Sequence, residues 1–226
     1  MWVRGELRVK GKRFGVEEGS TWTCSMSLGS PACFHRPLMD IGTFLNNFSH
    51  LVYPHETYLC YEVERLEGDL WIPVDEFKGF LRNQGADMGW EQCHAEPIFL
   101  ERMASWKLDK GLRYRVTCYI SYTPCAACAC ELAKFLRENT HVDLRIFAAR
   151  IYDRFWSYGF GLRALKAAGA EVAMMTFDEF EHCWESFVDH QGIFFPPWDD
   201  LDAQSEELSR RLEGILQKPG ESCGTQ

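Results

Sequence analysis

Apolar and polar residues alternate along several short stretches of the chain. Residues 57–66 alternate and are rich in Tyr and Val, which is typical of a half-buried strand. The turn residues Glu67-Gly68-Asp69 follow, and they predict a hairpin into a second strand at residues 71–74. The pattern predicts three further strands, at residues 113–122, 142–149 and 171–175.

Helical repeats of apolar residues separate these strands. They predict helices at residues 40–48, 131–137, 162–168 and 199–217, besides a helix that begins near His94. The last helix is acidic and amphipathic, and its expected buried side carries Leu201, Leu208, Leu212 and Leu216. Strands that alternate with helices indicate an α/β sandwich.

The chain is expected to hold one domain and two flanking segments. Residues 1–36 are rich in Gly, Ser and charge and lack sustained periodicity, so we expect a disordered extension there. Residues 37–218 hold enough apolar side chains for one core, and no internal repeat divides them. Residues 219–226 are expected to form a flexible tail.

Cysteine usage and hydropathy bear on the cellular compartment. The 10 cysteines are scattered along a long domain, and no N-terminal apolar segment resembles a signal peptide. A run of 18 apolar residues is also absent, so we expect no membrane partner. These features favour reduced thiols and a cytoplasmic and nuclear protein.

The formal net charge of −9 argues at first against a nucleic-acid partner, because binding phosphates requires Lys and Arg. The charge is unevenly spread. Residues 37–93 hold 3 basic and 10 acidic side chains and residues 167–226 hold 3 and 13, whereas residues 94–166 hold 12 and 7. We therefore expect a basic groove near the motifs that the middle segment carries.

Two motifs of metal-ligand type stand in this segment, His94-Ala95-Glu96 and Pro124-Cys125-Ala126-Ala127-Cys128. One imidazole and two thiolates give a tetrahedral zinc three ligands and leave the fourth position for water, as in catalytic sites. Cys125 and Cys128 share one face of a helix because they are three residues apart, whereas His94 and Glu96 do not share a face. We predict His94, Cys125 and Cys128 as zinc ligands and Glu96 as the proton carrier beside the metal.

Each motif taken singly has another interpretation. H-x-E occurs by chance in many chains, and C-x-x-C in an intracellular protein is also found as a redox pair or a structural zinc knuckle. Cys130 is an alternative to Cys128 as ligand, although on a helix it faces elsewhere. In the order H-x-E and then P-C-x-x-C, the two motifs form the zinc-deaminase signature, in which the Glu is general acid and base.

With these motifs the sequence resembles the AID/APOBEC polynucleotide cytosine deaminases. The resemblance is carried by His94 to Glu96, by Tyr122 to Cys128 and by the run from Ile146 to Asp153. Residues 57–65, 187–192 and 197–199 are closer still to the antiviral, single-stranded-DNA branch, and the similarity extends from about residue 37 to about residue 218. The chain departs from the family at Tyr122, where Trp is usual, and at Arg154, Phe155 and Trp156.

The resemblance implies a cytidine-deaminase-like sandwich, with a central mixed five-stranded sheet flanked by about six helices. It also implies one zinc ion per chain and hydrolytic deamination of cytosine to uracil in single-stranded DNA. Substrate contacts are implied for His55, Thr57, Asn83, Ala95, Tyr122, Thr123, Tyr152, Asp153 and Arg154. The residues alone favour a solvated loop histidine for His55 and a turn residue that caps its own backbone for Asn83, and the resemblance reverses this preference.

The loop at residues 152–156 resembles the one by which the family reads the base 5′ to the cytosine. Asp153 can accept a hydrogen bond from thymine N3–H, which favours thymine at that position. Arg154 suits phosphate contact or stacking, and a pair between Arg154 and Asp153 would oppose the preference. The aromatic residues from Trp184 to Trp198 lie in an acidic segment, so we expect core packing from them rather than base binding.

Other functions remain open at this point. A free-nucleoside or RNA deaminase would use the same zinc motifs. A catalytically weak, single-stranded nucleic-acid-binding restriction factor would keep the zinc for stability. RNA and viral antagonist or capsid proteins are therefore candidate partners besides single-stranded DNA.

Overall fold

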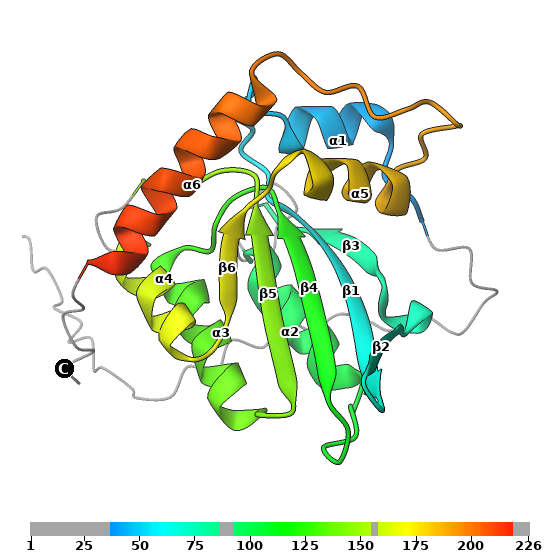
Figure 1. Ribbon diagram of the computed structural model, residues 1–226, viewed down its shortest axis with the longest axis vertical. Helices are drawn as coiled ribbons and strands as arrows, with labels where there is room; N and C mark the ends of the chain where they lie inside the picture. The colour runs from blue at the N-terminus through cyan, green and yellow to red at the C-terminus, as the bar shows by residue number, and fades with distance from the viewer. Residues whose placement is uncertain (1–36, 86–92, 155–157, 219–226) are drawn as a thin grey trace, which may run out of the picture.

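The computed structural model describes residues 37–85, 93–154 and 158–218. The extension expected at residues 1–36 and the tail expected at residues 219–226 lie outside the described residues. The described residues form a mixed β-sheet with helices on both of its faces (Figure 1). This arrangement confirms the predicted α/β sandwich.

The sheet is ordered β2-β1-β4-β5-β6, with β3 also paired to β1. Its strands are β1 (Tyr58–Glu67), β2 (Leu70–Pro73), β3 (Gly79–Arg82), β4 (Tyr114–Ile120), β5 (Val142–Ala148) and β6 (Glu171–Met174). β2 and β3 pair antiparallel with opposite halves of β1, and β4 is antiparallel to β1. β4, β5 and β6 are parallel to one another, so their carboxyl ends lie at one edge of the sheet.

The strand predictions hold for all but one strand. The predicted strands correspond to β1, β2, β4, β5 and β6, whereas β3 (GFLR) was not predicted, because it begins with Gly and places two large apolar residues side by side instead of alternating. The hairpin between β1 and β2 is confirmed. Its turn places Gly68 at a φ of 61°, a left-handed conformation that glycine adopts without steric strain.

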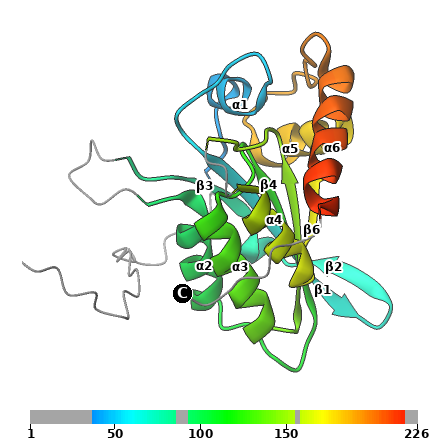
Figure 2. The same cartoon turned by 90° about the vertical axis from the view of Figure 1, so that its left-hand side faces the viewer.

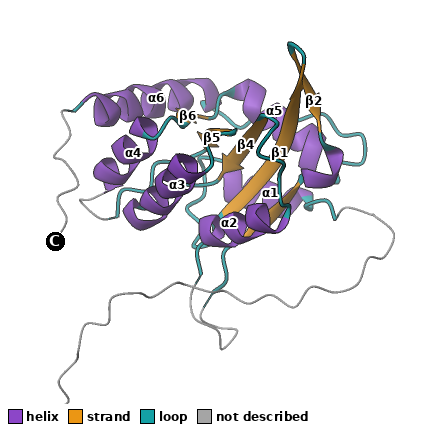
Figure 3. Ribbon diagram, turned by 90° about the horizontal axis from the view of Figure 1, so that it is seen from below, coloured by secondary structure: helices purple, strands orange, loops and turns teal. Residues whose placement is uncertain are grey.

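Two helical layers cover the two faces of the sheet. The helices are α1 (Ile41–Phe48), α2 (Ala95–Ser105), α3 (Ala126–Glu138), α4 (Tyr158–Ala167), α5 (Phe177–Phe187) and α6 (Leu201–Gln217). α2, α3 and α4 cover one face, and Figure 3 shows α3 between its two neighbours. α1 and α5 cover the upper part of the other face (Figures 1 and 2), while α6 packs against α4 and β6.

Three helices differ from the prediction. α4 begins at Tyr158, four residues before the helix predicted at residues 162–168. α3 begins at Ala126, five residues before the predicted helix, because its first turn of Ala and Cys shows no contrast between apolar and polar positions. α5 was not predicted, although Thr176 and Glu179 form a capping box, which is a sequence signal for a helix start.

The buried side of α6 is broader than predicted. Leu201 and Leu212 are buried as expected, whereas Leu208 and Leu216 are only partly buried. Ser205 and Ile215 are buried as well. The surface of α6 that packs against α4 and β6 is therefore wider than the leucines alone indicate.

The aromatic segment before α6 is largely core, as predicted. The buried members are Trp184, Phe187, Phe195 and Trp198. Phe194 is the exception, with 89% of its surface exposed. Within the described residues, no helix has both the length and the apolar character that a bilayer crossing requires.

α3 and α4 approach each other closely at Gly161. A Cβ added there would lie 2.6 Å from the Cα of Ala126 and 2.9 Å from its carbonyl oxygen. Real Cβ atoms do not approach backbone that closely, so only glycine fits this packing. The contact fixes the first turn of α3 against α4.

Candidate active site

Three metal-ligand side chains converge where α2 and α3 begin. His94 is the N-cap of α2, Cys125 is the N-cap of α3, and Cys128 lies in the first turn of α3. Nδ1 of His94 is 3.5 Å from Sγ of Cys125 and 3.3 Å from Sγ of Cys128, and all three donor atoms lie within 4.8 Å of one another. Tetrahedral zinc with ordinary Zn–S and Zn–N bonds separates nitrogen from sulfur by about 3.6 Å, so the three donors fit this ion.

Within the described part of the chain, this is the one cluster of His, Cys, Asp and Glu that could hold a metal, and Cys130 does not belong to it. Cys130 lies two residues beyond Cys128 on α3, where a helix turns the side chain to another face. The geometry therefore favours Cys128 over Cys130 as the third ligand.

The electrostatics of the cysteine pair suit a cation. Hydrogen bonds from Cys128 and His94 lower the pKa of Cys125 to about 4, although partial burial opposes the shift. The same Cys128–Cys125 hydrogen bond, together with burial, raises the pKa of Cys128. Both sulfurs lie at the positive end of the α3 dipole, and metal binding favours the thiolate form of both.

Glu96 lies beside the three donors in the first turn of α2, with only 4% of its surface exposed. Burial raises the pKa of its carboxyl group to about 7. The side chain lines the same cavity as His94 and Cys125. A buried carboxyl group that reaches a cavity beside a metal centre can exchange protons with a molecule bound there.

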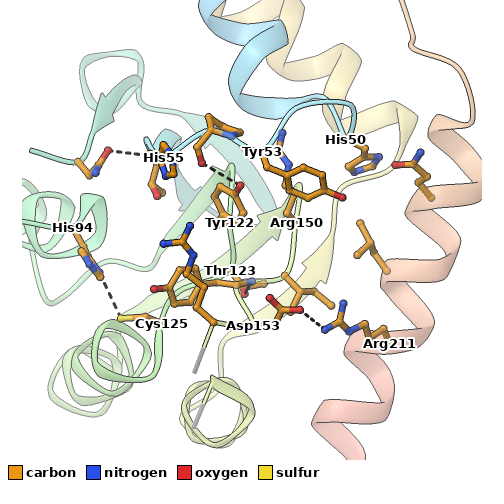
Figure 4. Close-up of a pocket in the computed structure, with 18 of the residues that line it drawn as sticks. His50, Tyr53, His55, His94, Tyr122, Thr123, Cys125, Arg150, Asp153 and Arg211 are labelled. Atoms are coloured by element: carbon orange, nitrogen blue, oxygen red, sulfur yellow. Dashed lines mark hydrogen bonds and ion pairs between the residues drawn. The ribbon is translucent and has the colours of Figure 1, made fainter. Parts of the chain in front are cut away.

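The cavity has a volume of about 860 Å³ and extends from the metal centre to α6. It is lined by most of the residues expected to contact substrate: His55, Thr57, Asn83, Tyr122, Thr123, Tyr152, Asp153 and Arg154 (Figure 4). Ala95 is fully buried in the first turn of α2 and does not line the cavity. The structure therefore brings together loops that are far apart in the sequence.

Hydrogen bonds between these residues fix the shape of the cavity. The backbone N–H of Thr57 donates to Oδ1 of Asn83 at 2.8 Å, so Asn83 ties the start of β1 to the end of β3 instead of capping its own backbone. The backbone N–H of Tyr152 donates to Oγ1 of Thr123 at 2.9 Å. The hydroxyl of Tyr122 donates to the carbonyl of Pro54 at 3.2 Å.

Arg150 also lines the cavity, although no role was predicted for it. Its guanidinium donates to the carbonyls of Asn47, Ser121, Ser49 and Val52. It also lies over the ring of Tyr122, 5.1 Å from the ring centroid, and only 4% of the residue is exposed. Arg150 therefore holds the segment between α1 and β1 against the cavity wall; the only signal in the sequence was a charge directly after an apolar strand.

Asp153 pairs with a residue that the sequence did not indicate. Its Oδ2 lies 2.7 Å from Nη2 of Arg211 on α6, whereas the sequence suggested Arg154 as the partner. Arg211 is 58 residues away along the chain, so no local pattern could reveal the contact.

The expected basic surplus is not found among the described residues that line the cavity. Arg150, Arg154 and Arg211 are balanced by Glu96, Asp153, Asp200 and Glu207. Several arginines of the basic segment instead pair with acidic residues on neighbouring strands: Arg113 with Asp143, Arg115 with Glu64, and Arg145 with Glu171. Charge summed along the sequence thus overstated the charge at the site.

Comparison of the sequence with known proteins identifies a family. Residues 37–216 match the family model described as APOBEC3, cytosine deaminase domain. The chain is 53% identical over 190 residues to the protein named DNA dC->dU-editing enzyme APOBEC-3G from Papio anubis and 51% identical to that from Pongo pygmaeus. Each match covers 82% of this chain but only 49% and 50% of those proteins, so the chain spans about half their length.

A shorter relative is covered more fully. The DNA dC->dU-editing enzyme APOBEC-3H of Felis catus is 42% identical over 165 residues, which are 73% of this chain and 80% of that protein. The family model covers the whole described fold from the start of α1 almost to the end of α6, including the zinc-ligand cluster and the cavity. This chain therefore belongs to the APOBEC3 family of cytosine deaminase domains.

Proposed function

We propose that this chain deaminates cytosine to uracil in single-stranded DNA by zinc-dependent hydrolysis. The observation that carries the proposal is the buried carboxyl of Glu96 beside the His94, Cys125 and Cys128 donors, at the end of an open cavity. The family match and the names of the relatives support cytosine in DNA as the substrate.

In the proposed reaction, the zinc ligands hold the metal and Glu96 transfers protons. When bound, zinc supplies the Lewis acidity that lets a water molecule ionise near neutral pH. Glu96 takes one proton from this water and delivers it to N3 of cytosine while the water oxygen bonds to C4. It then takes the remaining proton from that oxygen and transfers it to the amino group, which leaves as ammonia. Overall, one water is consumed, the C4–N4 bond breaks, and uracil and ammonia form.

The surrounding residues hold the base. The ring of Tyr122 forms a wall of the cavity and is fixed by its hydrogen bond to Pro54 and by Arg150. We propose that the base stacks on this ring. The resemblance assigns the base carbonyl to the backbone N–H of Ala95, but this residue is fully buried and does not line the cavity, so that contact is not part of the proposal. A base inside a duplex cannot enter the cavity without being extruded, so a single strand is favoured.

Measuring uracil formation tests the proposal directly. The unmodified chain is expected to convert a single-stranded DNA oligonucleotide with one cytosine and to leave the matching duplex unreacted. Equal rates on an RNA of the same sequence would favour an RNA deaminase, and binding without turnover would favour a nucleic-acid-binding restriction factor. A role in antiviral or anti-retroelement defence, in cytoplasm and nucleus, is part of the proposal and rests on the resemblance.

The base 5′ to the cytosine is expected to be read by Asp153. Arg211 engages Oδ2, which leaves Oδ1 to accept a hydrogen bond from thymine N3–H. We expect Asp153→Ala to relax a 5′-TC preference by about fivefold or more, since a good base-edge contact is worth about 1–3 kcal/mol. Arg211 contacts only Oδ2 and so holds the carboxylate in place without occupying Oδ1. Arg211→Ala should therefore also relax the preference, but by less than about fivefold, because an exposed ion pair contributes about 0–1 kcal/mol.

Deamination rates on four oligonucleotides that differ only in the 5′ neighbour measure this preference. Arg210→Ala is the matched control for Arg211→Ala, since Arg210 is the neighbouring residue on α6, pairs with Glu207 and does not line the cavity, and it should leave the preference unchanged. A preference that stays unchanged in Asp153→Ala would show that another group reads this base.

A further inference from the structure

The segment between α1 and β1 borders the cavity and has three exposed side chains in a row. Leu51, Val52 and Tyr53 have exposed fractions of 62%, 42% and 79%. Of the three, only Tyr53 lines the cavity. An aromatic ring of this size that meets a cavity yet remains open to solvent is a candidate contact for a ligand.

The backbone on both sides of Tyr53 is fixed. Arg150 donates from Nη2 to the carbonyl of Val52 at 2.9 Å, and the hydroxyl of Tyr122 donates to the carbonyl of Pro54 at 3.2 Å. Arg150 also binds the carbonyls of Asn47 and Ser49 before the exposed residues. The ring of Tyr53 is therefore exposed on a backbone that is held in place.

Tyr53 lies on the α6 side of Tyr122. Figure 4 shows Tyr53, Asp153 and Arg211 on this side and His94 on the other, and the same cavity is lined by all of them. A nucleotide next to one whose base reaches the metal centre would enter this part of the cavity. There, Asp153 offers a hydrogen-bond acceptor to the edge of a base and Tyr53 offers a flat surface to its face.

We propose that Tyr53 is a preformed stacking platform for the base 5′ to the target cytosine, a role that rests on the proposed function. Stacking on an aromatic side chain is tolerant of base identity, because every base has a π-face. Tyr53 then contributes affinity while Asp153 contributes the choice of base. Fixing the backbone beforehand lowers the entropy that is lost when the strand binds.

The test compares Tyr53→Ala, Tyr53→Phe and Tyr53→Trp with the unmodified chain on a single-stranded oligonucleotide that holds one TC step. Dissociation constants come from fluorescence anisotropy, and KM and kcat come from uracil formation. Tyr53→Ala should weaken binding and raise KM by about 5- to 150-fold, the fold-change that corresponds to a stacking contribution of about 1–3 kcal/mol. The Phe and Trp variants should bind as the unmodified chain does, and kcat should change little.

Two controls separate stacking from other effects. Leu51→Ala removes an exposed apolar side chain of the same segment that does not line the cavity, and it should leave binding unchanged. In a second oligonucleotide the 5′ thymine is replaced by an abasic nucleotide. On this oligonucleotide the difference between Tyr53→Ala and the unmodified chain should disappear.

The inference is overturned if Tyr53→Ala and Leu51→Ala bind equally well, or if the Tyr53 effect is as large on the abasic oligonucleotide. It is also overturned if the unmodified chain does not bind the single strand at all. If the chain binds but forms no uracil, the proposed function fails, while the anisotropy series still decides the role of Tyr53.

Discussion

Replacing Glu96 by Gln should reduce kcat for uracil formation by at least about 10³-fold, while the chain keeps its zinc. Gln preserves the size of the side chain but cannot carry the proton from water to the base, and general acid–base catalysis typically contributes about 10²–10⁴-fold. Glu96 serves two successive proton transfers in the proposed reaction, so its loss should lie toward the upper end of this range. Uracil release from a single-stranded oligonucleotide and metal analysis of the same sample measure both quantities.

Glu101→Gln is the matched control for this prediction. It makes the same chemical change on the same helix, α2, at a residue that does not line the cavity. Its turnover should equal that of the unmodified chain. A Glu96→Gln variant that retains more than a tenth of the original kcat would exclude Glu96 as the essential proton carrier.

Zinc should be lost from His94→Ala, Cys125→Ser and Cys128→Ser, and turnover should be lost with it. These residues supply all the protein donors of the cluster, and a site with two ligands holds the ion far more weakly than one with three. The variants should also lose thermal stability, because an ion that binds only the folded chain stabilises it by mass action. Metal content per chain and thermal unfolding with and without added zinc check both expectations.

Cys130→Ser provides the comparison, since it removes a thiol from the same helix outside the cluster. It should retain one zinc per chain and the unfolding temperature of the unmodified chain. Full zinc occupancy in Cys128→Ser, or loss of zinc in Cys130→Ser, would mean that the third ligand is assigned to the wrong cysteine.

The metal centre could be predicted from the sequence because its geometry is local. Cys125 and Cys128 are three residues apart, and this spacing alone brings both side chains to one end of a helix. Glu96 lies two residues from His94, which places it beside the ligands rather than among them. The principal strands were likewise predictable, since β1 and β4 are long enough to show their pattern.

The far part of the cavity could not be predicted, because it depends on contacts between distant segments. Arg211 reaches Asp153 only because α6 packs across α4 and β6. Arg150 acts by binding four backbone carbonyls, three from residues 47–52 and one from Ser121. The position of Tyr53 beside the cavity could not be predicted from the sequence, because Arg150 and Tyr122 fix the backbone on both sides of it.

Gly161 lies outside the cavity, but its close packing against α3 affects the position of the zinc ligands. Ala126, against which Gly161 packs, directly follows Cys125, so any side chain at position 161 would displace the turn that carries both cysteines. The two sulfurs would then shift relative to His94, which belongs to a different helix and would not move with them. A side chain at position 161 should therefore weaken zinc binding, although this residue touches neither metal nor substrate.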